Sequence, residues 1–237
     1  MTDEGKSITE KWVASKKASY PYAFDKGGKL ARRFGVTGLP TAVLIDATGT
    51  VVWRGHPGRL GAEQIRPALD GALKTPLFNW PKEAEGAKKA LVKGQVAKAL
   101  ELAKKVEGGA DIVSSIQGLI DKRMADMDTA FAKQNYYLAM TLAEENVKGL
   151  AGLPQATEAA ELAKRISDDG ELKKLVKGQK KLADIRLEMG SIGKKKDADK
   201  LIKSAEKVGK SYKGTVVADQ ANELVGKLNK LRRSFKR

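Results

Sequence analysis

The sequence predicts an α/β segment followed by an all-α region of helical repeats or a helical bundle. Thr41–Ile45 is a run of β-favouring residues, and Val51–Trp53 is a second such run after a short polar turn. From Lys82 onward the chain is rich in alanine, lysine, leucine and glutamate, with apolar residues at helical spacing. These two observations define the predicted fold class.

The composition is that of a folded chain with a strong positive charge. Hydrophobic residues make up 41% of the 237 residues, and the formal net charge is +16. No run approaches the roughly 18 apolar residues of a membrane-spanning helix, and the polar N-terminus shows no secretion signal. The sequence leaves the compartment open: cytoplasmic as written, extracytoplasmic if an upstream signal has been lost. The positive excess favours acidic partners, but its spread along the chain is typical of a solvated surface.

Two short helices are predicted near the N-terminus. The first starts at Ser7, because Ser7-Ile8-Thr9-Glu10 has the spacing of a capping box, and it ends before Pro21. Tyr20–Phe24 is a candidate minor strand. Leu30 and Phe34, four residues apart, predict the second helix, which should end at Gly35.

A β-hairpin is predicted to follow. Gly38-Leu39-Pro40 requires an extended or turned backbone, because the residue before a proline avoids the helical region. Thr41–Ile45 is apolar enough for a strand buried on both faces. Asp46–Gly49 supplies turn residues, Val51–Trp53 is the returning strand, and Arg54–Gly58 is a predicted loop.

The segment closes with a helix and a linker. Ile65, Leu69 and Leu73 recur at helical spacing. His56 is the only histidine and has no cysteine, second histidine or carboxylate pair nearby, so we predict no metal site, no cofactor and no catalytic histidine. The predicted domains are residues 1–74 and 82–237, and the linker is 75–81.

The second region contains an internal repeat. Three segments align at offsets of 40 and 62 residues: Ala90–Val106, Ala130–Asn146 and Ile192–Val208. A loop and a further helix follow each of them: Ile112–Met124, Ala156–Ile166 and Val217–Leu228. Ala103, Ala143 and Ala205 coincide, which predicts close helix packing at these positions. An extra helix, Glu171–Glu188, precedes the third unit. The units are only loosely similar to tetratricopeptide-type repeats; such an array offers a partner surface, but a compact bundle fits equally.

Two basic clusters raise the question of nucleic-acid binding. They are Lys194–Lys196 and Arg232–Arg237, and phosphate neutralisation requires such charge. No nucleic-acid motif accompanies them, and aromatic residues, on which bases stack, are only 5% of the chain. The sequence therefore weighs against specific nucleic-acid binding.

The first segment resembles a known family over the pattern D-x-x-G-x-L-A-x-x-F-G-V-x-G-x-P-T-x-x-L-I-D-x-x-G. The residues that carry the resemblance are Asp25, Gly28, Leu30, Ala31, Phe34, Gly35, Val36, Gly38, Pro40, Thr41, Leu44, Ile45, Asp46 and Gly49. This stretch is similar to the C-terminal half of a thioredoxin-like domain, most of all to the redoxin family of thiol–disulfide oxidoreductases and peroxide reductases.

The resemblance implies a substrate groove at Leu39, Pro40 and Thr41. In the family, the proline that matches Pro40 is cis and faces the redox-active cysteines. The backbone of Leu39 would meet an extended substrate, as in strand addition, and Thr41 would begin the supporting strand. Whether the substrate is a protein disulfide or a peroxide stays open.

The family's cysteine motif is absent, since the chain contains no cysteine. The elements that carry it would lie before Met1, and without a thiolate there is no nucleophile for disulfide exchange. The predicted function is a redoxin-like protein that is redox-inactive as written. The alternatives are a non-enzymatic helical-repeat scaffold and, more weakly, a basic nucleic-acid-associated protein. A protein partner would bind the helical region or the open sheet edge, where self-association is also possible.

Overall fold

The computed structural model describes residues 5–17, 23–36, 38–47, 49–73, 75, 77–189, 192 and 194–235. Over these residues the protein is mostly helical, with one two-stranded antiparallel sheet. The helices are α1 (Lys6–Lys16), α2 (Lys29–Arg33), α3 (Ala62–Ala68), α4 (Glu85–Val92), α5 (Val96–Ala103), α6 (Ala110–Ala132), α7 (Tyr136–Gly149), α8 (Pro154–Asp168), α9 (Gly170–Met189), α10 (Lys195–Ser211) and α11 (Val216–Ser234). The strands are β1 (Ala42–Ile45) and β2 (Val51–Gly55).

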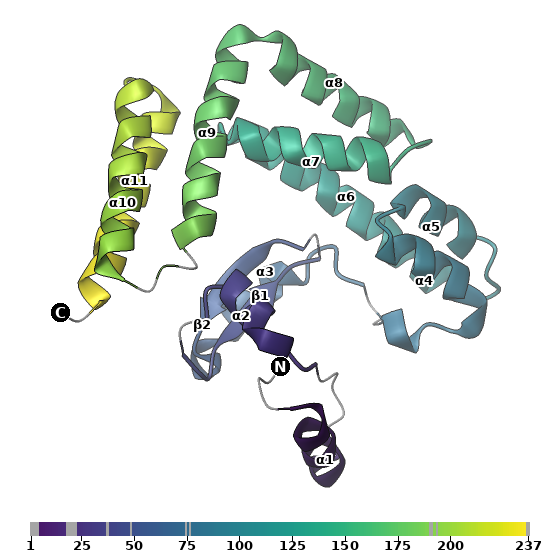
Figure 1. The fold of residues 1–237 in the computed structure, drawn as a ribbon. Coiled ribbons are helices and arrows are strands. Elements are labelled where there is room, and N and C mark those ends of the chain that lie inside the picture. Colours follow the sequence, from purple (N-terminus) through teal and green to yellow (C-terminus); the bar gives the residue numbers. More distant parts are fainter. Residues whose placement is uncertain are drawn as a thin grey trace.

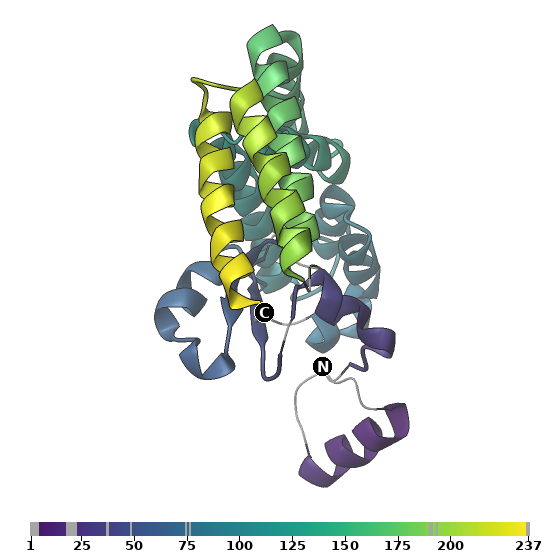
Figure 2. The same cartoon turned by 60° about the vertical axis from the view of Figure 1, so that its left-hand side comes forward.

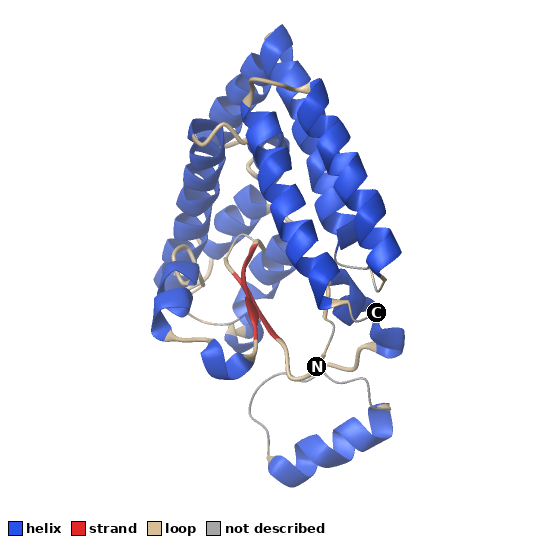
Figure 3. Cartoon of the chain, turned by 90° about the vertical axis from the view of Figure 1, so that its left-hand side faces the viewer, coloured by secondary structure: helices blue, strands red, loops and turns tan. Residues whose placement is uncertain are grey.

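The long helices form an arch over the hairpin. Helices α4 to α11 follow one another around this arch, and β1, β2, α2 and α3 lie in its opening (Figures 1 and 3). Helices α10 and α11 lie side by side against α9 (Figure 2). Helix α1 stands apart from the rest in these views. The hairpin segment is thus placed between the two ends of the helical region.

The hairpin forms where the sequence predicts it, with different limits. Leu44 pairs with Trp53, and the turn is closed by the Asp46 N–H, which donates to the Thr50 carbonyl at 2.9 Å. The prediction that Arg54 begins a loop is wrong, because β2 continues to Gly55 and pairs with β1 up to Ala42. The prediction that the first strand is buried on both faces is also wrong, since Ile45 is 44% exposed and the rest of β1 is only half-buried.

The helices of the first segment also differ from prediction. Helix α1 has Gly5 at its N-cap and no side-chain cap, so Ser7 lies inside the helix and the predicted capping box does not form. Tyr20–Tyr22 and Pro21 lie outside the described residues, and Phe24 forms only a single β-bridge. Helix α3 ends at Ala68 because a turn with a left-handed Gly71 (φ +68°) follows.

The core of the helical region consists of successive clusters along the arch. The cluster nearest the hairpin joins α4, α5 and α6, and Trp80 is buried in it. The indole N–H of Trp80 donates to the Thr75 carbonyl at 3.0 Å. Leu73 and Leu77 pack against the same cluster. The predicted linker is therefore anchored in the helical core by its tryptophan.

The first two repeats share one turn geometry. In each, the aligned segment is broken by a turn with a residue at positive φ, Gly94 (+74°) or Gln134 (+56°). The residue after it donates to the carbonyl five positions earlier, Gln95 to Ala90 at 3.0 Å and Asn135 to Ala130 at 2.8 Å. The repeated segments are therefore not single helices. The third segment instead begins in the loop before α10.

The helical hairpins α7–α8 and α10–α11, which correspond to the second and third repeats, have similar connecting loops. Gly152 and Gly214, both at positive φ, lie in the α7–α8 and α10–α11 loops. The three alanines that coincide in the repeats, Ala103, Ala143 and Ala205, are fully buried. These facts support the repeat alignment, whereas the tetratricopeptide type stays a prediction.

One buried amide joins separate parts of the arch. Gln179 on α9 is 2% exposed. Its Oε1 accepts the N–H of Tyr137 at 3.0 Å, and its Nε2 donates to the Gln134 carbonyl at 2.7 Å and to Gln220 Oε1 at 3.1 Å. Because an unpaired buried amide is costly, this side chain couples the α6–α7 turn to α9 and α11.

Candidate functional site

The three predicted groove residues lie at an exposed corner before β1. Leu39 is 76% exposed, and the Leu39–Pro40 peptide bond is cis. The hydroxyl of Thr41 donates to the Gly38 carbonyl at 2.5 Å, which fixes the backbone that enters β1. The corner therefore presents backbone and an apolar side chain to solvent.

Helix α2 is held at its N-terminal end by Asp25. Asp25 is 7% exposed, and its carboxylate accepts hydrogen bonds from the N–H groups of Leu30 at 3.0 Å and Ala31 at 2.9 Å. The first N–H groups of a helix have no partner within the helix and therefore attract a negative charge. The N–H groups of Ala31 and Leu30 hold the pKa of the Asp25 carboxyl below its ordinary value. The aspartate of the motif thus has a local structural function.

The other end of α2 is closed by backbone and by Arg54. Gly35 (φ +61°) donates to Arg32 at 3.0 Å and Val36 donates to Ala31 at 2.8 Å, which is a Schellman arrangement. Arg54 Nη1 donates to the carbonyls of Phe34 at 2.8 Å and Gly35 at 3.0 Å. Sequence reasoning missed this contact because Arg54 was assigned to a loop and its partners lie about twenty positions earlier in the chain.

The sheet is open beside the groove residues. Within the described residues, β1 pairs with β2 alone. Val51 and Val52 of β2 are about half exposed, as is Ile45. A free strand edge is a template for pairing with another chain, and it lies directly after Leu39, Pro40 and Thr41.

The remaining sequence candidates have structural surroundings of their own. His56 Nδ1 accepts the N–H of Gly58 at 3.1 Å, a local cap. No group of histidine and acidic side chains in the described ranges could hold a metal ion. Lys194–Lys196 and Arg232–Arg233 lie at the same end of the α10–α11 hairpin, where Arg232 Nε lies 2.5 Å from Asp199 Oδ1. Lys236 and Arg237 lie outside the described residues.

The described chain shows no means of crossing a bilayer by a helix. None of its helices combines the required length with the required apolar character. The described residues form a mostly helical protein with a small antiparallel hairpin.

Comparison with known proteins shows a partial similarity to thiol–disulfide oxidoreductases. Over 72 residues the chain is 33% identical to the thiol–disulfide oxidoreductase ResA of Bacillus thuringiensis subsp. konkukian, and equally to ResA of Bacillus cereus. The match covers 30% of this chain and 39% of each relative. No protein-family model matches the chain, and neither does a solved structure. The similarity indicates a thioredoxin-like relationship for part of the chain.

Proposed function

We propose that this chain belongs to a redoxin-like protein of the thiol–disulfide oxidoreductase family and provides a peptide-binding corner rather than redox chemistry. Leu39, Pro40 and Thr41 would form one wall of a groove for an extended substrate. The helical region from residue 82, with 75–81 as its anchored linker, would bind a protein partner. Residues 1–237 contain no cysteine, so they supply no thiolate for exchange.

The observation that carries this proposal is the position of the exposed Leu39 corner at the start of an open strand. Strand addition gains affinity from main-chain hydrogen bonds, and alternate side-chain pockets give specificity. Asp25 and Arg54 fix both ends of the adjacent α2. The partial similarity to ResA, whose name is thiol–disulfide oxidoreductase, supports a disulfide as the substrate class.

The test is binding of an extended peptide whose cysteines are S-methylated, followed by NMR on residues 1–237. We expect shifts and slower amide exchange in Ala42–Ile45. Leu39→Pro should abolish binding because it removes a backbone N–H, whereas Leu39→Ala, the matched control, should retain it. An unchanged affinity of the Leu39→Pro variant for the peptide would contradict the proposal. Insulin reduction by the chain with dithiothreitol, clearly above buffer, would contradict its redox-inactive part.

A second candidate is a non-enzymatic scaffold that binds partners along the helical arch. The observation in its favour is the repeated hairpin geometry, with equivalent turns at Gly94 and Gln134. Repeat arrays provide extended binding surfaces. If partners bind a chain carrying Leu39→Pro as well as they bind the unaltered chain, the scaffold function is favoured over the groove.

A further inference from the structure

A cavity of about 460 Å³, partly open to solvent, lies between the hairpin segment and the helical arch. Its walls come from the β1–β2 turn, from α3 and the turn after it, and from α4, α5 and α6. The lining is mostly aliphatic and includes Leu44, Ile65, Leu69, Leu73 and Leu119. Ligand sites are typically concave, mostly apolar and furnished with a few polar groups, and this cavity has that composition.

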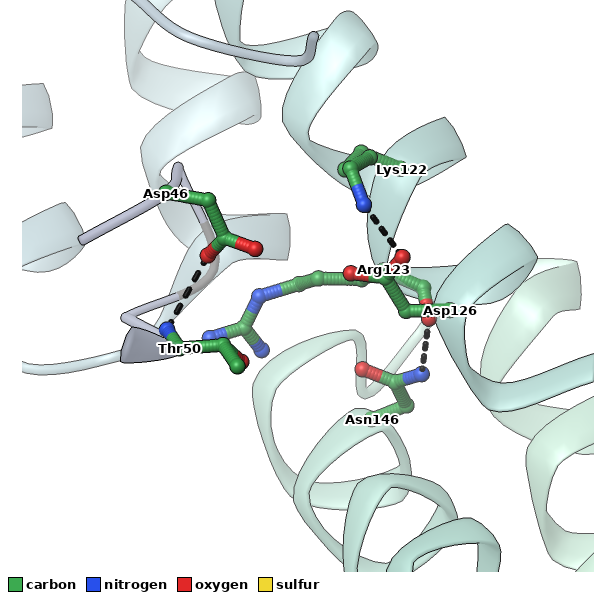
Figure 4. A network of polar contacts seen from close by, with 6 residues as sticks. All are labelled: Asp46, Thr50, Lys122, Arg123, Asp126 and Asn146. Atoms are coloured by element: carbon green, nitrogen blue, oxygen red, sulfur yellow. Dashed lines mark hydrogen bonds and ion pairs between the residues drawn. The ribbon is translucent and has the colours of Figure 1, made fainter. Parts of the chain in front are cut away.

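The cation of the cavity is Arg123 on α6. Its Nε is buried without a hydrogen-bond partner, and no ion pair of the described residues includes Arg123. Figure 4 shows its side chain extending from α6 toward the turn that carries Asp46 and Thr50. Asn146 Nδ2 donates to the Arg123 carbonyl at 3.3 Å, which holds the backbone of this residue in place.

The Nε of Arg123 is buried while the side chain as a whole is partly exposed, and this arrangement favours an anionic ligand in the cavity. Leaving a buried charged donor unpaired is costly, and such groups in native structures point to a missing water, ion or ligand. The neighbouring Lys122 does not share this feature, because it pairs with Asp126. The planar guanidinium suits a carboxylate, which it can bind through two parallel hydrogen bonds.

Asp46 restricts the charge of the ligand. It lines the same cavity, and its Oδ1 accepts the N–H of Thr50 at 3.0 Å. This carboxylate repels any anion in the cavity, and the repulsion grows with the negative charge of the ligand. The site therefore favours a single negative charge over phosphate or a dicarboxylate.

We propose that this cavity binds an amphipathic monocarboxylate, with the carboxylate on Arg123 and an aliphatic body along the leucine-rich walls. At about 30 Å³ for each water-sized group, the 460 Å³ cavity would hold about 15 such groups. A straight-chain acid of about ten carbons, which has a similar number of heavy atoms or fewer, fits within that volume.

The experiment is calorimetric titration of the full chain with decanoate and with decanol, both below the concentration at which they form micelles. We expect decanoate to bind at least about ten-fold more tightly, since a charge-assisted hydrogen bond exceeds a neutral one. Arg123→Met should remove that preference. Arg186→Met, which removes an exposed arginine outside the cavity, should keep it. Ala72→Phe, which fills the cavity, should weaken both ligands.

The proposal would be overturned by equal binding of decanoate and decanol by the unaltered chain, or by no binding of either. Unchanged decanoate binding by Ala72→Phe would also do so, because it would place the ligand elsewhere. If circular dichroism shows that Arg123→Met does not fold, Arg123→Lys replaces it. This variant retains the charge without the planar fork, so we expect a reduced but measurable preference for decanoate, and an unchanged preference would contradict the assigned geometry.

Discussion

Replacing Gly71 with alanine tests whether the first segment is docked on the helical arch. Gly71 follows α3 in a left-handed conformation, with φ +68°. A Cβ at this position would lie 2.5 Å from Lys122 Cβ and 3.1 Å from the Gly118 carbonyl oxygen, both on α6. Because the first of these contacts is with a Cβ, whose position is fixed by the backbone, the overlap cannot be relieved by rotating a side-chain end.

The expected destabilisation has two parts. A left-handed non-glycine residue costs about 1 kcal/mol, and overpacking adds about 1–3 kcal/mol. Gly71→Ala should therefore lower the free energy of unfolding by about 2–4 kcal/mol. For a protein of this size that corresponds to a fall in Tm of roughly 4–16 °C. Urea unfolding followed by tryptophan fluorescence measures it, since Trp80 is buried in the cluster against which Leu73, two residues after Gly71, packs.

Gly94→Ala is the matched control. Gly94 has φ +74°, and no atom lies within 4 Å of an added Cβ, so only the conformational cost of about 1 kcal/mol applies. The difference between the two variants isolates the contact with α6. Equal destabilisation by both variants would refute the docking of the α3 turn on this helix.

Three further predictions concern other parts of the chain. Gln179→Leu should cost about 1–3 kcal/mol, because it removes the three hydrogen bonds of a buried amide and leaves the part-buried backbone groups of Gln134 and Tyr137 without these partners. The urea midpoint measures this cost, and a neutral effect would contradict the assigned network. The pKa of Asp25 is lowered in the folded protein, so its stabilising effect is complete above its ordinary pKa of about 3.9 and is lost as pH falls through the lower pKa of the folded state. Asp25→Asn should therefore have a lower free energy of unfolding than the unaltered chain at pH 7. This difference in free energy should narrow toward pH 3. A fragment 82–237 should be less stable than 75–237 by about 3–5 kcal/mol, since it lacks the buried Trp80; equal thermal midpoints would show that this side chain contributes nothing to the helical core.

Signals between near neighbours in the chain predicted much of the fold. Leu30, Phe34 and Gly35 predicted α2 and its end, and the turn at Asp46–Gly49 with its flanking β-favouring runs predicted the hairpin. The errors concern limits of elements. The helix after Ile65 stops early because Gly71 turns the chain, so Leu69, expected on an apolar helical face, is largely exposed.

The candidate groove was predicted by resemblance, and its supports were visible only in the structure. Nothing in the local sequence indicates that Arg54 reaches the carbonyls of Phe34 and Gly35, because the partners are about twenty positions apart. The same holds for Gln179, whose partners lie more than forty positions away on both sides. Side-chain hydrogen bonds at such separations depend on how the elements pack.

The sequence by itself determined the elements with local causes: helices from apolar spacing and turns from glycine. It also shows that residues 1–237 contain no cysteine. The tertiary structure decided what those elements enclose. From the sequence, Arg123 is expected to be an ordinary surface residue of a charged helix. Its Nε is buried beside an apolar cavity because the helical arch places α6 next to the β1–β2 turn. The physical reason is that desolvation of a charge depends on every element packed around it, whereas helix and turn formation depend mainly on neighbours within a few residues.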